Sequence, residues 1–154
     1  MPMLPPPESP ENATLPEYIS KWLFVAQEIA PKFRPHFEVV LDFSESSLAI
    51  LDNVIDGCWP EPPKKLGHMV AAFGSYLGET IRRRLGGQWI ADEGDAFCLL
   101  NVGNTDTRVF PFSKMEKRFV NGIEDALADY CTTIKTAVAV LPKLSNDSSQ
   151  SGNV

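Results

Sequence analysis

The chain has 154 residues, of which 44% are hydrophobic, and this length and composition fit one domain with its own core. Its formal net charge of −6 argues against a nucleic-acid partner, because proteins that bind phosphate backbones carry basic faces. The one dense basic run, Arg82–Arg84, falls in the last turn of a predicted helix, where cations interact favourably with the helix dipole.

The ends of the chain differ in composition from its middle. Residues 1–13 are rich in proline and poor in residues that build a core, and residues 143–154 are rich in serine and asparagine. This composition predicts a disordered arm over 1–13, a single domain over 14–142 and a disordered tail over 143–154.

Three widely spaced cysteines, Cys58, Cys98 and Cys131, fit a reduced protein with buried thiols rather than a disulfide framework or a zinc site. The sequence shows neither a signal-peptide pattern nor an apolar run of about 20 residues, so we expect a cytoplasmic protein with no membrane partner.

The first helical pattern covers residues 15–29, where apolar residues recur at helical spacing behind Thr14, a predicted N-cap. Pro31 and Pro35 are expected to end this helix, because proline cannot donate a backbone hydrogen bond.

A second helix is predicted to begin at Ser44. Phe43, just before this cap, and Leu48, four residues into the helix, form a hydrophobic staple. Gly57 is expected to end the helix.

The third and longest helix is predicted over residues 64–85, with a wide apolar face at spacings of three and four. A second stripe on this helix holds small residues: Gly67, Ala71, Gly74 or Ser75, and Gly78. Interior glycines cost about 1 kcal/mol each relative to alanine, so we expect another helix to pack closely here. A homodimer joined through this face is a further possibility.

Three segments of strand character follow, 88–91, 97–102 and 107–110. Their short polar connections favour an antiparallel meander. A short helix or turn over 112–119 and a last helix, capped by Asn121 and ending near Leu141, complete the chain. The predicted fold is α+β, with about four helices around a small three-stranded antiparallel meander.

Glu79 is the one candidate for chemistry, since it lies inside the long helix, three and four residues before Arg82 and Arg83. The pattern leaves three alternatives open: an exposed ion pair with these arginines, a buried bracket that accepts hydrogen bonds from the backbone of the sheet, or a ligand-binding acid. In the last case Tyr76 and Trp89 would flank Glu79 in a shallow groove, whereas Trp89 is otherwise a core residue.

Acidic residues are concentrated between Glu38 and Glu61, a stretch without lysine or arginine. The residues that we nominate for binding a basic partner are Asp42, Glu45, Asp52 and Asp56. No residue is assigned as catalytic, and no cofactor or metal is predicted, because His36 and His68 lack further ligands at metal-binding spacing.

Residues 74–79 (Gly-Ser-Tyr-Leu-Gly-Glu), followed by residues 86–89 (Gly-Gly-Gln-Trp), resemble a signature of small bacterial domains of unknown function. The resemblance covers residues 66–131, with Phe-Pro-Phe at 110–112 as a weaker second match. It implies a bacterial cytoplasmic protein but no activity. The residues that it nominates as defining the domain are Tyr76, Gly78, Glu79, Gly87 and Trp89.

Together these patterns favour a non-enzymatic domain that binds a protein, such as an immunity or accessory protein that neutralises a basic toxin or nuclease. The alternative is a small-molecule binder or weak hydrolase with Glu79 in a shallow pocket.

Overall fold

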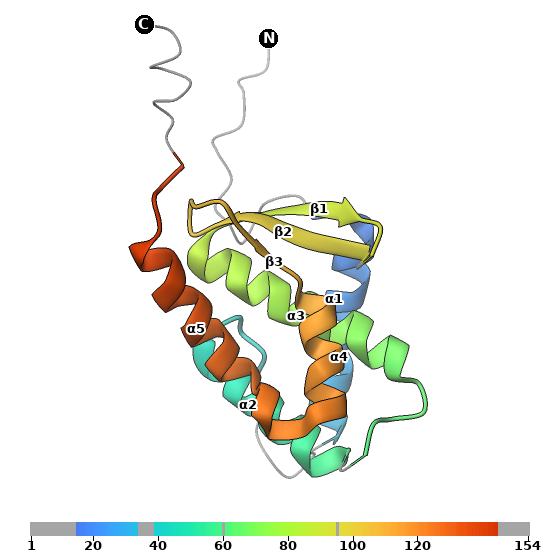
Figure 1. Cartoon of the computed structure of the whole chain (residues 1–154). Coiled ribbons are helices and arrows are strands. Elements are labelled where there is room, and N and C mark those ends of the chain that lie inside the picture. Colours follow the sequence, from blue (N-terminus) through green and yellow to red (C-terminus); the bar gives the residue numbers. More distant parts are fainter. Residues whose placement is uncertain (1–14, 34–38, 60, 95, 145–154) are drawn as a thin grey trace, which may run out of the picture.

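The computed structural model describes residues 15–33, 39–59, 61–94 and 96–144, whose elements are shown in Figure 1. In chain order the elements are α1 (Glu17–Phe33), α2 (Glu45–Cys58), α3 (Leu66–Leu85), β1 (Gln88–Asp92), β2 (Ala96–Val102), β3 (Thr107–Val109), α4 (Pro111–Asn121), the 3-10 helix η2 (Gly122–Asp125) and α5 (Leu127–Val140). The described residues form the predicted α+β fold, but with five α-helices rather than about four, because the segment expected as a short helix or turn is the full helix α4. The predicted N-terminal arm, the Thr14 cap and most of the predicted tail lie outside the described residues.

The sheet is the predicted antiparallel meander in the order β1-β2-β3. Trp89 of β1 pairs with Leu99 of β2, and both side chains are buried in the core. The sheet lies across α3 in Figure 1, so the face that carries Trp89 and Leu99 is covered by helices.

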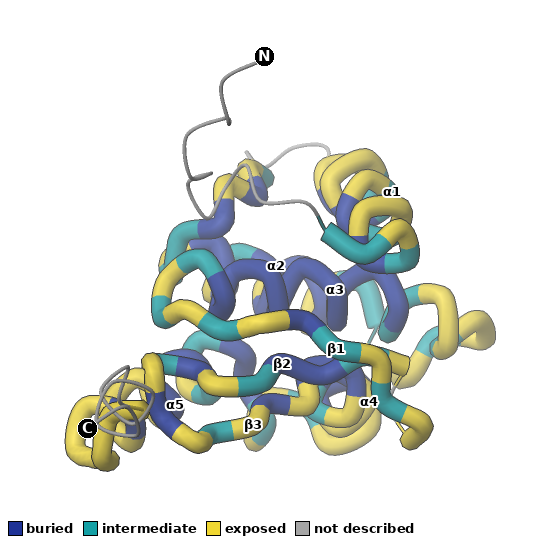
Figure 2. The backbone as a smooth tube through the Cα atoms, turned by 90° about the horizontal axis from the view of Figure 1, so that it is seen from above, coloured by how far each residue is buried: buried dark blue, intermediate teal, exposed yellow. Residues whose placement is uncertain are grey.

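Helix α3 runs through the middle of the molecule, and every residue from Ala71 to Arg82 is buried. Figure 2 shows this helix as a dark-blue segment between α1 on one side and the sheet on the other. A surface helix buries one face only, so burial on all sides identifies α3 as the central element of the fold.

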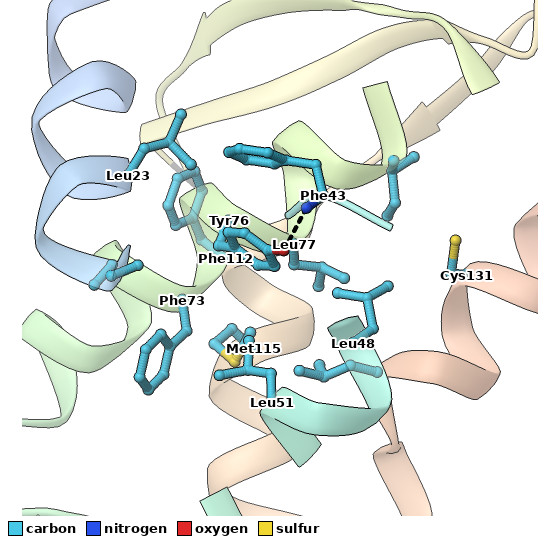
Figure 3. Packing of buried hydrophobic residues seen from close by; sticks show 14 of the residues in the cluster. Leu23, Phe43, Leu48, Leu51, Phe73, Tyr76, Leu77, Phe112, Met115 and Cys131 are labelled. Atoms are coloured by element: carbon cyan, nitrogen blue, oxygen red, sulfur yellow. Dashed lines mark hydrogen bonds between the residues drawn. The ribbon is translucent and has the colours of Figure 1, made fainter. Parts of the chain in front are cut away.

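The core gathers side chains from all five helices and the sheet around α3. Figure 3 shows Phe73, Tyr76 and Leu77 of α3 in one cluster with Leu48 of α2 and Met115 of α4. Apolar burial on this scale is the main force that holds such a domain together.

Helix α1 continues through Pro31 to Phe33, so the prediction that Pro31 ends this helix is wrong. Proline in a last turn removes only one hydrogen bond. Tertiary contacts hold the turn: Ala30 is fully buried, and the Phe33 ring packs edge-on against Trp59 at 4.5 Å. The predicted start of α2 is confirmed, because the Ser44 side chain accepts a hydrogen bond from the Ser47 backbone N–H.

The small-residue stripe of α3 packs against side chains of the same chain. A Cβ atom at Gly74 would lie 2.6 Å from Cδ1 of Phe112 in α4, and a Cβ at Gly78 would overlap the Trp89 ring. The expected close approach of another helix is therefore supplied by α4. Gly74 and Gly78 are therefore internal, whereas Gly67 of the same stripe is exposed and meets nothing within 4 Å, so a homodimer through this stripe stays a prediction.

Candidate functional site

Glu79 is fully buried, and both of its carboxylate oxygens accept hydrogen bonds from side chains of α3 and β1. Its Oε1 accepts from Trp89 Nε1 at 3.0 Å and from Arg82 Nε at 2.8 Å. Its Oε2 accepts from Arg82 Nη2 at 2.7 Å and from Arg83 Nε at 2.8 Å. Arg82 thus forms the two-pronged contact that a guanidinium makes with a carboxylate. Glu79 connects the start of β1 to the last turns of α3.

The neighbours of Glu79 keep its carboxyl group ionised. Burial alone would raise its pKa, but hydrogen bonds from Arg82, Arg83 and Trp89 outweigh burial and hold the pKa below its usual value. The exposed ion pair expected as one alternative is wrong, because the side chain has no exposed surface. The side chain takes the position of the bracket, but it bonds the indole of Trp89 rather than the backbone of the sheet.

Tyr76 is also fully buried, and its hydroxyl positions the segment that leads into α2. It accepts a hydrogen bond from the Phe43 backbone N–H at 2.8 Å and lies 2.6 Å from Ser47 Oγ. Phe43 has a φ of 64°, which is rare for a bulky residue. Its ring stacks on Tyr76 at 4.9 Å and lies 3.7 Å below the Arg83 guanidinium. These contacts hold the strained backbone of Phe43 in place.

The four acidic residues nominated for partner binding fall into different environments. Asp42 is exposed and accepts hydrogen bonds from the Ser44 hydroxyl and backbone N–H, which hold its pKa below the usual value. Glu45 forms a 3.1 Å ion pair with Lys135 of α5. Neither residue lies near Asp56 along α2, so the nominated residues do not form one continuous acidic surface.

Asp52 is only 6% exposed and bonds within the chain, so its assignment to a partner-binding surface is corrected. Its Oδ1 accepts from Arg118 Nε at 2.6 Å, and both oxygens accept from the Leu127 backbone N–H at 3.0 Å. Its Oδ2 also accepts from the Ala128 N–H at 3.2 Å. Asp52 of α2 therefore caps the N-terminus of α5, in place of the predicted cap Asn121, which is the last residue of α4.

Arg118 of α4 joins the two carboxylates of α2. Its side chain is 1% exposed, and its Nη2 donates to Asp56 Oδ1 at 2.7 Å and to the Asp52 carbonyl at 3.3 Å. Burial alone would lower the pKa of Arg118, but the bonds to Asp52 and Asp56 outweigh it and raise the pKa. Asp56 remains 46% exposed at its side chain, so this ionic cluster reaches the surface at Asp56.

A hollow of about 280 Å³ opens where α2 and α4 end, beside the Arg118 cluster. Its polar lining includes Asp56, Glu61 and Arg118, and its apolar lining includes Trp59 and Val120. We call it the acidic hollow. A second hollow of about 290 Å³ on α4 shares Val120 and is also lined by Lys117. Glu79 lines neither of the two, and both of its oxygens are engaged, so this geometry does not favour the small-molecule or hydrolase alternative.

Sequence reasoning missed Arg118 and the acidic hollow. One signal was available: Met115 and Arg118 are three residues apart, so they share one face of an amphipathic helix, and a charged residue on that face requires a buried partner. The sequence pattern could not identify Asp52 as this partner, because Asp52 and Arg118 are 66 residues apart.

Among the residues that the structure describes, no group of three or more His, Cys, Asp and Glu side chains is placed to hold a metal ion. Burial raises the pKa of the Cys131 thiol to about 11. None of the described helices combines the length and the apolar character that crossing a bilayer requires.

Comparison of the chain with models of known families, with curated proteins and with solved structures gave no match.

Proposed function

We propose that this chain is a protein-binding domain of the immunity or accessory type, which acts in the bacterial cytoplasm and binds a basic partner protein through the acidic hollow. The observation that carries the proposal is a hollow with carboxylates at its rim and apolar side chains in its wall. Complementary charge speeds encounter, and a desolvated apolar contact supplies affinity, so this combination suits recognition of a protein.

The proposal moves the partner surface away from the residues first nominated. Asp52 is buried and bonds within the chain, and Glu45 is paired with Lys135. Asp56 is the nominated residue that lines the hollow. Glu61, at the end of the same acidic stretch, is exposed and lines the hollow as well.

The residues of the suggested family signature support a structural role beside this site. Tyr76, Glu79 and Trp89 are bonded inside the molecule, and Gly78 leaves the space that the Trp89 ring fills. In this proposal the signature specifies the fold, while the partner is selected at the hollow.

The test is capture from the native cell extract on the immobilised full chain, at low and at raised salt. The binding variant is Asp56→Asn with Glu61→Gln, and the matched control is Asp106→Asn with Glu93→Gln, which removes the same charge from the exposed turns of the sheet. We expect a basic protein that the wild type and the control retain, that the binding variant loses and that salt releases. Equal capture by both variants, or no basic protein at either salt, would refute the proposal.

A further inference from the structure

The acidic hollow is electronegative beyond the charge of its two rim carboxylates. Helices α2 and α4 both end at it, and the last carbonyl groups of a helix carry a partial negative charge. The last turn of α2 holds no basic residue to offset this charge. The one cation in the lining, Arg118, is already bonded to Asp52 and Asp56, so the carboxylates outnumber it.

Arg118 holds one of the rim carboxylates in place. Its side chain is 1% exposed and lines the hollow, and its hydrogen bonds to Asp52 and Asp56 are made by Nε and Nη2. These bonds fix Asp56 at the rim of the hollow, where its side chain remains 46% exposed.

The size and the wall of the hollow restrict the occupant further. A volume of about 280 Å³ lies just below the range of about 300–1,000 Å³ that is typical of small-molecule sites. Trp59 and Val120 offer apolar and aromatic surface, along which the stem of a long basic side chain can lie while its charged end meets carboxylates.

We propose that the acidic hollow accepts one arginine or lysine side chain of the basic partner, with the cation against Asp56 and Glu61 and the aliphatic stem on Trp59 and Val120. This inference rests on the proposed function, because it names the group by which the partner is recognised. The occupant is a basic side chain from another protein, and a metal ion or a second copy of this chain are alternatives that the test separates.

The test uses the isotope-labelled full chain and titrates it with N-acetyl-arginine amide, followed by NMR at the backbone amide of Gly122 and the indole N–H of Trp59. The matched probe is N-acetyl-citrulline amide, which has nearly the same shape without the charge. We expect the arginine probe to shift these signals with a dissociation constant on the order of 1 mM, the weak range expected of so small a ligand, and the citrulline probe to shift them far less.

Variants then locate the site. Asp56→Asn with Glu61→Gln should weaken the arginine probe about tenfold, as expected for the loss of two partly exposed ion pairs, while Asp106→Asn with Glu93→Gln leaves it unchanged. Glu61→Gln alone keeps the ion pair of Asp56 with Arg118 and should still weaken the probe, so a folding defect in the double variant does not decide the outcome.

Two outcomes with the probes would overturn the inference: no shift with the arginine probe, or equal shifts with the arginine and citrulline probes. A third would be signals at the hollow that shift with calcium chloride or with raised protein concentration but not with the arginine probe. Capture from extract is a separate measurement. A captured basic protein without probe binding at the hollow refutes this inference alone, whereas probe binding without a captured protein refutes the proposed function.

Discussion

Asp52→Asn is the substitution that should damage this fold most for the smallest change in shape. Every hydrogen bond that the Asp52 side chain makes is accepted, from Arg118 at Oδ1 and from the first N–H groups of α5 at both oxygens. An asparagine amide has one oxygen and one donor nitrogen, so in either orientation its NH2 group faces another donor. The substitution also leaves the buried guanidinium with Asp56 as its only carboxylate.

The magnitude follows from burial. Removing one partner of a buried ion pair costs about 3–5 kcal/mol, and the Arg118 and Asp52 side chains are 1% and 9% exposed. Asp56→Asn is the internal comparison, since Asp56 is 46% exposed and bonds Arg118 through one oxygen that the amide can replace, so its cost should be about 0–1 kcal/mol.

Urea unfolding followed by tryptophan fluorescence measures both costs through linear extrapolation to water. Asp52→Asn should lower the free energy of unfolding by about 3 kcal/mol more than Asp56→Asn does. If the two variants differ by less than about 1 kcal/mol, the double role of Asp52 as ion-pair partner and helix cap is refuted.

Gly78→Ala should destabilise the chain by about 1–3 kcal/mol, because the added Cβ overlaps a core ring, whereas Gly67→Ala meets nothing within 4 Å and should stabilise by up to about 1 kcal/mol in thermal unfolding. The same sign for both variants would contradict the packing described for α3. The lowered pKa of Glu79 contributes stability that is present above its unfolded value near 4.5 and is lost as pH falls through the folded value. Urea titrations of Glu79→Gln should therefore show a shallower loss of stability below about pH 4.5 than those of the wild type. Parallel curves for the two proteins would show that Glu79 is not the source of the acid sensitivity. Tyr76→Phe removes the acceptor of the Phe43 N–H and should cost about 1–3 kcal/mol and speed hydrogen exchange at that amide, while unchanged exchange would show that Tyr76 does not hold this segment.

Local patterns were enough to predict most of the elements. The N-cap Ser44 predicted the start of α2, and the polar turns of the meander predicted the limits of the three strands. These signals act between residues a few positions apart, so they can be recognised in the sequence. The end of α1 and the start of α5 were mispredicted, since Trp59 holds the first and Asp52 caps the second from elsewhere in the chain. Such contacts have no local signature.

The candidate site shows the same division. The neighbours Arg82 and Arg83 of Glu79 followed from helical spacing, and the structure adds the indole of Trp89. The acidic stretch was visible in composition, but composition cannot distinguish Asp52, which is buried, from Asp56, which reaches the surface. The two lie four positions apart, and contacts with Arg118 and with the start of α5 decide their environments.

The central position of α3 has a consequence for how the chain is made. Two helices precede α3 in the sequence, and the sheet, α4 and α5 follow it, so an emerging chain presents α3 before most of its covering elements exist. Its apolar residues then remain open to chaperones or to aggregation until the last helix has left the ribosome. Once α3 is enclosed, its backbone amides can reach solvent only when its neighbours detach together, so they should be the slowest of the chain to exchange with deuterium.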